Sequence, residues 1–453
     1  MAIAENITEL GTKPIGSLLP KYATPAVIAM TASSLYNIID AIFIGQGVGP
    51  LAIAGVSLSF PVMQVTSAFG AMVGVGAATL LSVKLGERDY DTARKILGNV
   101  LLLNIIMGVV MGALMLAFIN PILYFFGASD ETVSYARDFM TIVLLGNVVT
   151  HLYLGMNSLL RASGHPREAM FATIGTVCLN ILFAPLFIYA FKWGIQGAAA
   201  ATVLSQLLVL IWELWLFSNP NEFIHFQRKH ISLDQRIVTG TLSIGMSPFL
   251  MNLCGCIVTV FFNWSLAHYG SDLEIAAYGI NNRLAFFFAM IVVGLNQGMQ
   301  PIAGYNYGAR KFDRLRQTLI RSIMVATGVV FVGFVLCMLF PYACVRAFTS
   351  DKQLIESSAY AIQIMFLAFP IIGFQMVTTN FFQCIGQVRK SIFLSMTRQL
   401  LFIIPLLYVL PKYFGLTGIW YTIPLSDLLS TFLTGYFLIK MLRQLRTLTP
   451  HKS

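Results

Sequence analysis

One carboxylate, that of Asp40, stands within a long apolar segment near the start of the chain. Tyr36 and Asn37 precede it by four and three residues, so on a helix the three side chains share one face. An acid at the centre of a membrane helix costs about 2.5–3.5 kcal/mol on insertion scales, and chains accept that cost mainly where the acid handles an ion, a proton or a substrate. The alternative is that Asp40 lies near the helix end and reaches headgroup water.

A second group of oxygen atoms is expected around Asn180, which lies in an apolar segment and is followed by Pro185. Proline inside a helix frees the carbonyl four residues before it, here that of Ile181. An amide oxygen beside a free carbonyl suits a small cation or a protonated acid; the alternative is an interhelical hydrogen bond with a kink. Thr202 is either a third ligand or bonded to its own backbone. At about 1.5 Å per residue, Asp40, Asn180 and Thr202 all fall between the outer surface and the midplane, as one cation-coupling site requires.

Flexible thioethers, aromatic rings and amides within apolar segments suit a cavity that takes varied amphipathic cations. The alternative for any one such side chain is contact with lipid or with the protein core. The candidate substrate contacts are Tyr36, Asn37, Gln64, Tyr153, Met156, Asn157 and Gln206.

No residue pattern typical of an enzyme is found. The six histidines are scattered, the six cysteines all fall in apolar segments, and there is no glycine loop for phosphate. We therefore expect no catalytic residues, no metal site, no cofactor and no ATP-driven mechanism.

Composition places these residues in a membrane protein. The chain has 453 residues, of which 57% are hydrophobic and 11% charged, with a mean hydropathy of +0.76, whereas soluble domains carry about 25% charged residues. The sequence predicts an all-α integral membrane protein with twelve transmembrane helices. They are expected at 16–45, 51–83, 92–119, 131–159, 167–191, 194–217, 236–268, 274–303, 315–344, 353–383, 390–411 and 415–440.

Lysine and arginine set the predicted orientation. Most of the 29 basic residues fall on one side of the membrane when the N-terminus is placed inside, so we expect a multi-pass membrane protein with both termini cytoplasmic. The net charge of +10 is then a topology signal and a contact for anionic membrane lipid, not a surface for nucleic acid.

The chain also repeats itself. Residues 84–97 match 306–319, and Gly86 aligns with Gly308. This predicts an N-terminal six-helix lobe carrying the ionisable site (1–217), a cytoplasmic linker (218–235) and a C-terminal six-helix lobe with a cytoplasmic tail (236–453), the lobes being parallel repeats. Asp40 aligns with Asn263, so the acid occurs in one half only.

Other charges within the apolar segments are weaker candidates. Asp427 aligns with Gln206. We expect Arg283 and Arg398 to pair with acids or carbonyls, and Glu213, near the inner end of its helix, to be interfacial.

The sequence resembles the multidrug and toxic compound extrusion (MATE) family over essentially the whole chain. The likeness is carried by YNIIDAIFIG (36–45), RASGHPR (161–167), QPIAGYNYGA (300–309) and the paired six-helix halves. A lone acid in the first span, with no acid at Asn263, is similar to the DinF-like bacterial branch, and this resemblance implies the bacterial inner (plasma) membrane as the location.

The resemblance implies two six-helix bundles that alternate access, in a monomer. It implies export of small organic cations or amphipathic drugs in exchange for protons or sodium, with Asp40 as the coupling acid assisted by Asn180 and Thr202. Members of this pattern usually carry a second acid where this chain has Ala184. Because a hard cation prefers more anionic oxygen ligands, this departure favours protons over sodium.

Burial disfavours the charged form of a carboxyl group, whereas a bound organic cation favours the charged form. Binding of a proton converts the carboxylate to the neutral acid. Proton and drug therefore compete for Asp40, which is a sufficient basis for antiport. The main rival is a flippase for a lipid-linked substrate, but only Arg283 and Arg398 would be available to bind a pyrophosphate.

Overall fold

The computed structural model describes residues 2–126 and 130–448. Asn37, one of the predicted substrate contacts, has a side chain outside the described part. The side chains that are not described within these ranges belong to residues 2–6, 37–38, 41, 45, 50–51, 53–54, 57–58, 272 and 445–448.

The first half of the chain is helical wherever it is regular. Its elements are α1 (Ala2–Thr12), α2 (Ile15–Gly47), α3 (Pro50–Gly86), α4 (Tyr90–Ala117), α5 (Ile119–Phe125), α6 (Val133–Leu145), α7 (Asn147–Ala162), α8 (Pro166–Pro185), the π-helix η1 (Leu186–Ala190) and α9 (Gly194–Phe217).

The second half repeats this order after a short 3₁₀ turn, η2 (Arg228–His230). Its elements are α10 (Gln235–Tyr269), α11 (Asp272–Gly308), α12 (Phe312–Leu339), α13 (Pro341–Arg346), α14 (Lys352–Met365), α15 (Phe369–Cys384), α16 (Val388–Met396), the π-helix η3 (Thr397–Phe402) and α17 (Ile403–Leu448).

These elements make twelve spans, as predicted. Eight described helices are long and apolar enough to cross a membrane, and two bent pairs bring the number to ten. The stretch 388–444 contains two spans, because the backbone leaves the helical conformation at Gly415 (φ 56°, ψ −139°). The remaining span is α2, which has 33 residues.

Two of the predicted spans are bent in their middle. The segment expected at 131–159 is α6 and α7, which meet at Gly146 with a 55° bend, and that expected at 353–383 is α14 and α15, with a 57° bend. Pro370 lies in the first turn of α15 and has no N–H for a continuing helix. Hydropathy does not record such bends, because both arms of each pair are apolar.

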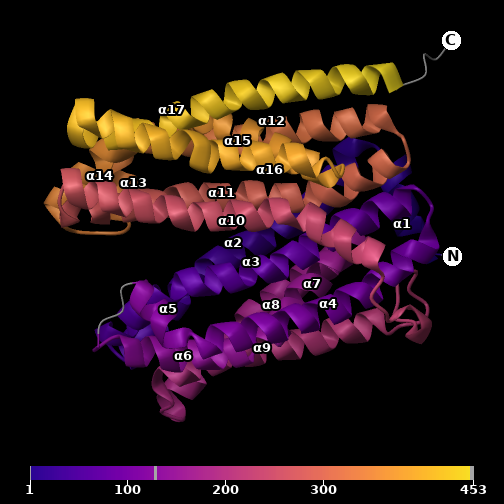
Figure 1. Cartoon of the computed structure of the whole chain (residues 1–453), viewed down its shortest axis with the longest axis horizontal. Helices are drawn as coiled ribbons and strands as arrows, with labels where there is room; N and C mark the ends of the chain where they lie inside the picture. The colour runs from indigo at the N-terminus through magenta and orange to yellow at the C-terminus, as the bar shows by residue number, and fades with distance from the viewer. Residues whose placement is uncertain (1, 127–129, 449–453) are drawn as a thin grey trace.

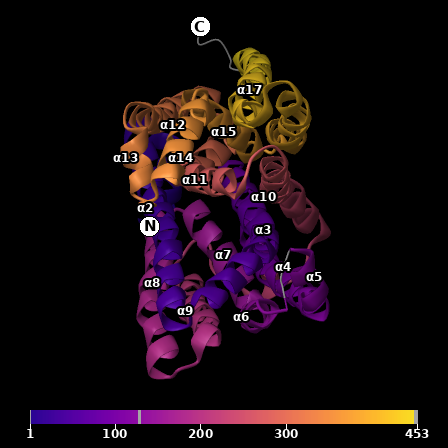
Figure 2. The ribbon, with the colours of Figure 1, turned by 90° about the vertical axis from the view of Figure 1, so that its left-hand side faces the viewer.

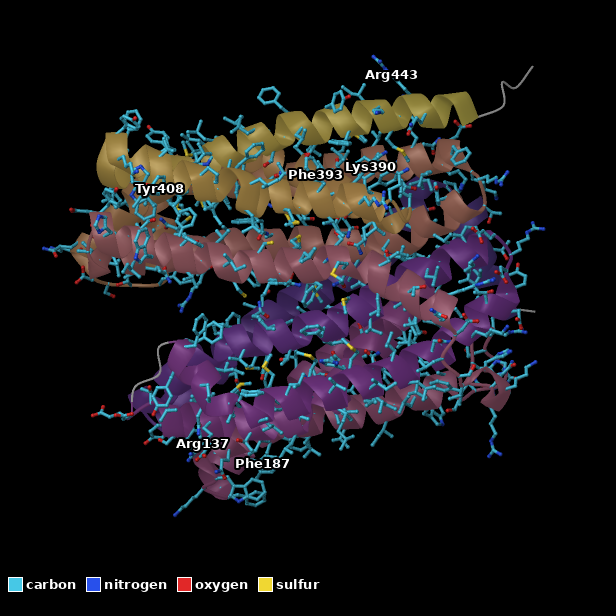
Figure 3. The ribbon with its side chains drawn as sticks, viewed as in Figure 1. Arg137, Phe187, Lys390, Phe393, Tyr408 and Arg443 are labelled. Carbon is cyan, nitrogen blue, oxygen red and sulfur yellow. The ribbon has the colours of Figure 1, made fainter. Side chains whose placement is uncertain are left out.

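The two halves form two layers that lie close together at the end of the molecule carrying both termini and diverge toward the other end (Figure 1). Where they meet, α3 packs against α10 and α2 against α11. Viewed from the other end, these four helices lie between the outer helices of the two halves (Figure 2). Lys390 and Arg443 are nearer the end with the termini than Tyr408 is (Figure 3).

Glycine allows α3 and α10 to approach so closely. A Cβ atom on Gly76 would lie 2.0 Å from the carbonyl oxygen of Thr241, and one on Gly245 would lie 1.8 Å from that of Met72. Any larger residue at either position would force the helices apart, so the contact between the halves depends on these two glycines.

The first helix is held by the second half of the chain. The guanidinium of Arg314, on α12, donates to the carbonyls of Leu10 and Lys13 at 3.2 and 2.6 Å. The Nζ of Lys311 donates to the carbonyl of Gly11 at 2.7 Å. These donors satisfy carbonyls that the end of a helix leaves without partners.

Candidate functional site

Three helices bring predicted site residues together: α2 carries Tyr36 and Asp40, α8 carries Asn180, and α9 carries Thr202. The Nδ2 of Asn180 donates to Thr202 Oγ1 at 2.9 Å, and the Tyr36 hydroxyl lies 3.4 Å from the same oxygen. Thr202 Oγ1 also donates to the carbonyl of Ala198 at 3.2 Å. The Thr202 hydroxyl therefore bonds its own backbone and links α2 to α8 at the same time.

The oxygen atoms of this cluster are only partly satisfied. The Asp40 carboxyl interacts with the Tyr36 hydroxyl one turn before it, but Asp40 Oδ1 is buried and has no hydrogen-bond partner. Asn180 Oδ1 is buried and unpartnered in the same way. Because a buried acceptor without a partner costs about 1–3 kcal/mol, such oxygens are suited to take a proton or a cation. We call Tyr36, Asp40, Asn180 and Thr202 the Asp40 cluster.

Ala184 lies one turn after Asn180 and is completely buried in a cluster of apolar side chains. Pro185 follows, and the helix changes there from α to the π-helix η1. The side chain at this position, where the resemblance implies a second acid, is therefore a methyl group. Asp40 supplies the carboxylate of this cluster.

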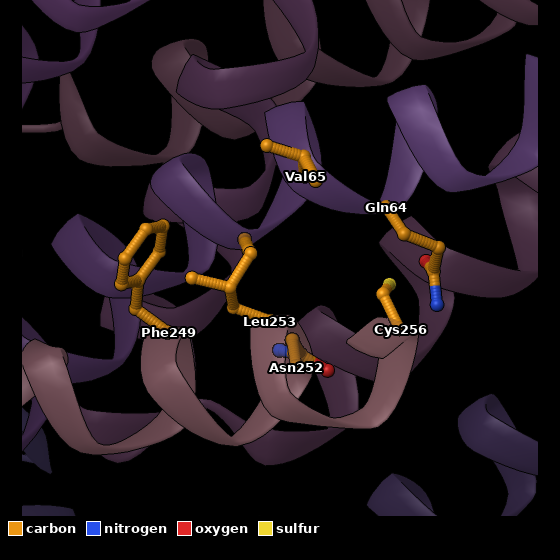
Figure 4. A pocket seen from close by; sticks show the side chains of 7 residues that line it. Gln64, Val65, Phe249, Asn252, Leu253 and Cys256 are labelled. Carbon is orange, nitrogen blue, oxygen red and sulfur yellow. The ribbon is translucent and has the colours of Figure 1, made fainter. Parts of the chain in front are cut away.

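Gln64 lies elsewhere, at the contact between the two halves. It lines a pocket between α3 and α10 whose other described walls are mostly apolar (Figure 4). Asn252 faces the same pocket from α10 and was not predicted from the sequence. The lining residues are Gln64, Val65, Ala68, Phe249, Asn252, Leu253 and Cys256.

The remaining predicted substrate contacts are inside the first half. Gln206 Oε1 accepts from the hydroxyl of Thr150 at 2.6 Å. Met156 is completely buried in the hydrophobic core, and Tyr153 and Asn157 are also buried. The structure joins none of these four to the Asp40 cluster by a direct hydrogen bond among the described residues. Their role as substrate contacts stays a prediction.

Asn157 belongs to a second polar cluster, nearer the end with the termini. Its Nδ2 donates to the carbonyl of Ala169 at 2.9 Å and to Glu213 Oε1 at 3.3 Å, and its Oδ1 accepts from Arg161. Glu213 was expected at the membrane interface, but 0% of it is exposed. The expectation was wrong because α7 and α8 cover that face of α9, which hydropathy does not indicate.

The second half contains a buried ion pair. Arg398 Nε, in the π-helix η3, lies 2.9 Å from Asp427 Oδ1 in α17, so Arg398 pairs with an acid as expected. Arg283, in contrast, is exposed. Asp427 thus has a direct cationic partner, whereas no described cationic side chain pairs with Asp40, so the two acids occupy different electrostatic environments.

Comparison with known proteins agrees with this architecture. A family model described as MatE matches residues 25–186 and again residues 247–409, once in each half. The multidrug export protein MepA of Staphylococcus haemolyticus is 28% identical over 423 residues, which are 93% of this chain and 92% of that protein.

Solved structures are similar over nearly the whole chain. The MATE multidrug transporter DinF-BH, solved in complex with a ligand, has a TM-score of 0.88 and 34% identity and covers 95% of this chain and 96% of its own. An outward-facing MATE transporter of the MOP superfamily has a TM-score of 0.91 and 26% identity, with 97% and 98% covered. With two matches to the family model, one in each six-helix half, this chain belongs to the MatE family of membrane transporters and is not an enzyme.

Proposed function

We propose that the protein is a multidrug exporter of the bacterial plasma membrane that exchanges organic cations for protons, with Asp40 as the coupling acid. The observation that carries the proposal is the buried, unpartnered Oδ1 of Asp40 beside Tyr36, in one half of a repeated fold. The acid of the second half differs in charge pairing, because Asp427 Oδ1 lies 2.9 Å from Arg398 Nε, although Asp427 Oδ2 has no hydrogen-bond partner among the described residues.

The chemistry follows from the two states of one carboxyl group. Ionised, Asp40 attracts an organic cation; protonated, it is neutral and its attraction for that cation is lost. A proton entering from the outer side therefore favours drug release there. Tyr36 and Thr202 link α2 to α9, so a change in the charge of Asp40 alters the contacts of α2 with its neighbours.

The substrate path of this proposal runs between the halves. Gln64 and Asn252 supply polar groups beside apolar side chains of α3 and α10, at a narrow pocket that has no room for a substrate until the halves separate. Such a lining suits amphipathic compounds, since the ring and alkyl parts are buried while a few amides accept or donate hydrogen bonds.

Sodium coupling is the second candidate. The unpartnered Asn180 Oδ1 is an oxygen ligand that a sodium ion could use beside Asp40. Against it stands Ala184, which leaves the cluster with a single anionic group where a hard cation prefers more.

Proteoliposomes test the proposal directly. Efflux of a fluorescent organic cation is followed under an imposed pH gradient and, separately, under a sodium gradient, for the wild type and Asp40→Asn. We expect pH-driven efflux that the variant loses by at least tenfold while it remains folded. Efflux driven only by the sodium gradient would show that sodium, and not the proton, is the coupling ion. Unaltered pH-driven efflux in Asp40→Asn would show that Asp40 is not the coupling acid.

A further inference from the structure

The Glu213 carboxyl group is a buried acid that the proposed exchange at Asp40 does not use. It is completely buried, and its Oε1 receives one hydrogen bond, at 3.3 Å, from Asn157 Nδ2. Its Oε2 is buried without a hydrogen-bond partner, as Asp40 Oδ1 is. Two buried carboxyl groups with a free oxygen therefore lie in the same half of the fold.

Arg161 is close to Glu213 but is bound to other groups. Its guanidinium donates to Asn157 Oδ1 and, at 3.4 Å, to Ser158 Oγ. Asn157 thus lies between the two charged groups: it donates a hydrogen bond to Glu213 and accepts one from Arg161. The arrangement differs from the Arg398–Asp427 pair, in which the charges touch, and it leaves Glu213 Oε2 available for a proton.

Polar side chains extend from Glu213 toward the Asp40 cluster along α7 and α8. Asn157 Nδ2 lies 3.5 Å from Thr173 Oγ1, and the Tyr153 hydroxyl interacts with both Thr173 and Thr176. Thr176 and Asn180 are one turn apart on the same face of α8, a rise of about 6 Å. Hydroxyl and amide groups thus contact one another from Glu213 to Thr176, and Asn180 follows one helical turn later without a direct hydrogen bond to Thr176.

We infer that Glu213 is a second proton-binding group of the transporter, joined to the Asp40 cluster by this row of hydroxyl and amide groups. The inference rests on the proposed proton coupling and adds the route by which the proton leaves. A proton released from Asp40 is taken up on Glu213 Oε2, which neutralises that carboxylate. It then passes to water at the end of the molecule that carries the termini, and Glu213 is ionised again.

The neighbours of Glu213 allow both of its charge states. Arg161 acts on the carboxylate through space, and the side chains packed around the cluster belong to the hydrophobic core. The groups that face Glu213 are the guanidinium of Arg161 and the phenol of Tyr153 from α7, and the hydroxyl of Thr173 from α8. Among the described residues of α2 and α6 no charged side chain interacts with it.

Infrared difference spectroscopy tests proton binding without transport. Spectra of the purified protein at low and high pH are subtracted, and the C=O stretching band of protonated carboxyl groups is compared among the wild type, Glu213→Gln and Glu168→Gln. Glu168 is half-buried in the first turn of α8, so it serves as a matched control at the same end of the bundle. We expect Glu213→Gln to lose one band that Asp40→Asn and the control retain. A spectrum unchanged in Glu213→Gln would overturn the inference.

Transport separates this inference from the proposed function. Glu213→Gln keeps the acceptor for Asn157 and should bind tetraphenylphosphonium as the wild type does, yet lose pH-driven efflux by at least tenfold. Equal pH-driven efflux in Glu213→Gln and wild type, with loss in Asp40→Asn, would overturn the role of Glu213 and leave Asp40 as the coupling acid. If efflux by the wild type did not depend on the pH gradient, the proposed function would be overturned. The infrared result would still decide whether Glu213 binds a proton.

Discussion

At the scale of single residues, the proposed coupling site has alanine where the resemblance to the family implies a second acid. Ala184 lies one turn from Asn180 and fills its space with a methyl group. Asp40 and Asn180 each keep one oxygen free. In the proposed mechanism, the choice between a proton and sodium depends on how much negative charge the cluster presents.

Adding a carboxylate at this position should change the coupling ion. We expect Ala184→Asp to give sodium-driven efflux at least fivefold above that of the wild type, because two carboxylates and the Asn180 amide offer a hard cation the oxygen ligands it prefers. Efflux from proteoliposomes under a sodium gradient measures the effect. Ala184→Asn has nearly the same size without the charge and should not respond to sodium; a sodium response equal in both variants would refute the argument from charge.

The Thr202 hydroxyl joins three groups, so its loss should lower the stability of the protein. Thr202→Val leaves the Asn180 Nδ2 without its acceptor at 2.9 Å, and an unpaired buried donor costs about 1–3 kcal/mol. We expect a lower midpoint of thermal unfolding in detergent for Thr202→Val and almost no change for Thr202→Ser, which keeps the oxygen. Equal midpoints for the two variants would show that the hydrogen bond contributes nothing.

Sequence reasoning found the residues of the Asp40 cluster but not their contacts. Asp40, Asn180 and Thr202 were indicated by polarity within apolar segments and by similar depth, which are properties of single helices. Depth does not say which faces meet, so Glu213 was misplaced at the interface although three helices enclose it. Two features of the sequence pointed to Glu213: its charge within an apolar span, and the presence of Arg161 near the end of α7.

At the scale of helices, the predicted spans agree with the observed ones to within a few residues, but their internal breaks were not predicted. The span expected at 194–217 is α9 with the same ends. The bends between α6 and α7 and between α14 and α15 were not expected, nor were the π-helices η1 and η3. Length and hydropathy decide where a helix crosses a membrane, whereas breaks depend on which backbone groups find partners in neighbouring helices.

We expect a single substitution to release α1 from the second half of the chain. Arg314 donates to the carbonyls of Leu10 and Lys13, and a cation at the end of a helix also interacts favourably with its dipole. We expect Arg314→Gln to speed hydrogen–deuterium exchange of the backbone amides of residues 10–13 by several-fold in the folded protein, as followed by mass spectrometry.

Arg316 provides the control for this experiment, since it is exposed on the same helix. Arg316→Gln removes the same charge and should leave the exchange rate of these amides unchanged. If both variants exchanged at the same rate, the attachment of α1 would not depend on Arg314.

At the scale of the whole molecule, closure between the halves depends on glycine at matched positions. A Cβ atom on Gly86 would lie 2.1 Å from the carbonyl oxygen of Tyr305, and one on Gly308 would lie 2.1 Å from that of Val83. Gly76 and Gly245 make the same kind of approach between α3 and α10. The halves therefore touch backbone to backbone near the end with the termini, which is the contact that an alternating-access transporter must break to open there.

Alanine at this contact should open the molecule at the end with the termini. In Gly245→Ala the new methyl group would overlap the carbonyl of Met72, 1.8 Å away, so α3 and α10 must separate. Spin labels at Asp91 and Asp313, exposed positions in the first turns of α4 and α12, report the separation by double electron–electron resonance. We expect the long-distance population to rise at least threefold over the wild type.

The control for that measurement lies on the same helix. A Cβ atom on Gly240 would meet nothing nearer than a methyl carbon of the Leu80 side chain at 3.5 Å, which is ordinary contact, so Gly240→Ala should leave the distances unchanged. If Gly245→Ala kept the wild-type distribution, the helices could absorb a methyl group without separating, and close packing of glycine would not be what holds this end shut. A shift in both variants would instead indicate a general loosening of α10. Only a shift confined to Gly245→Ala identifies the backbone contact as the closure that transport has to break.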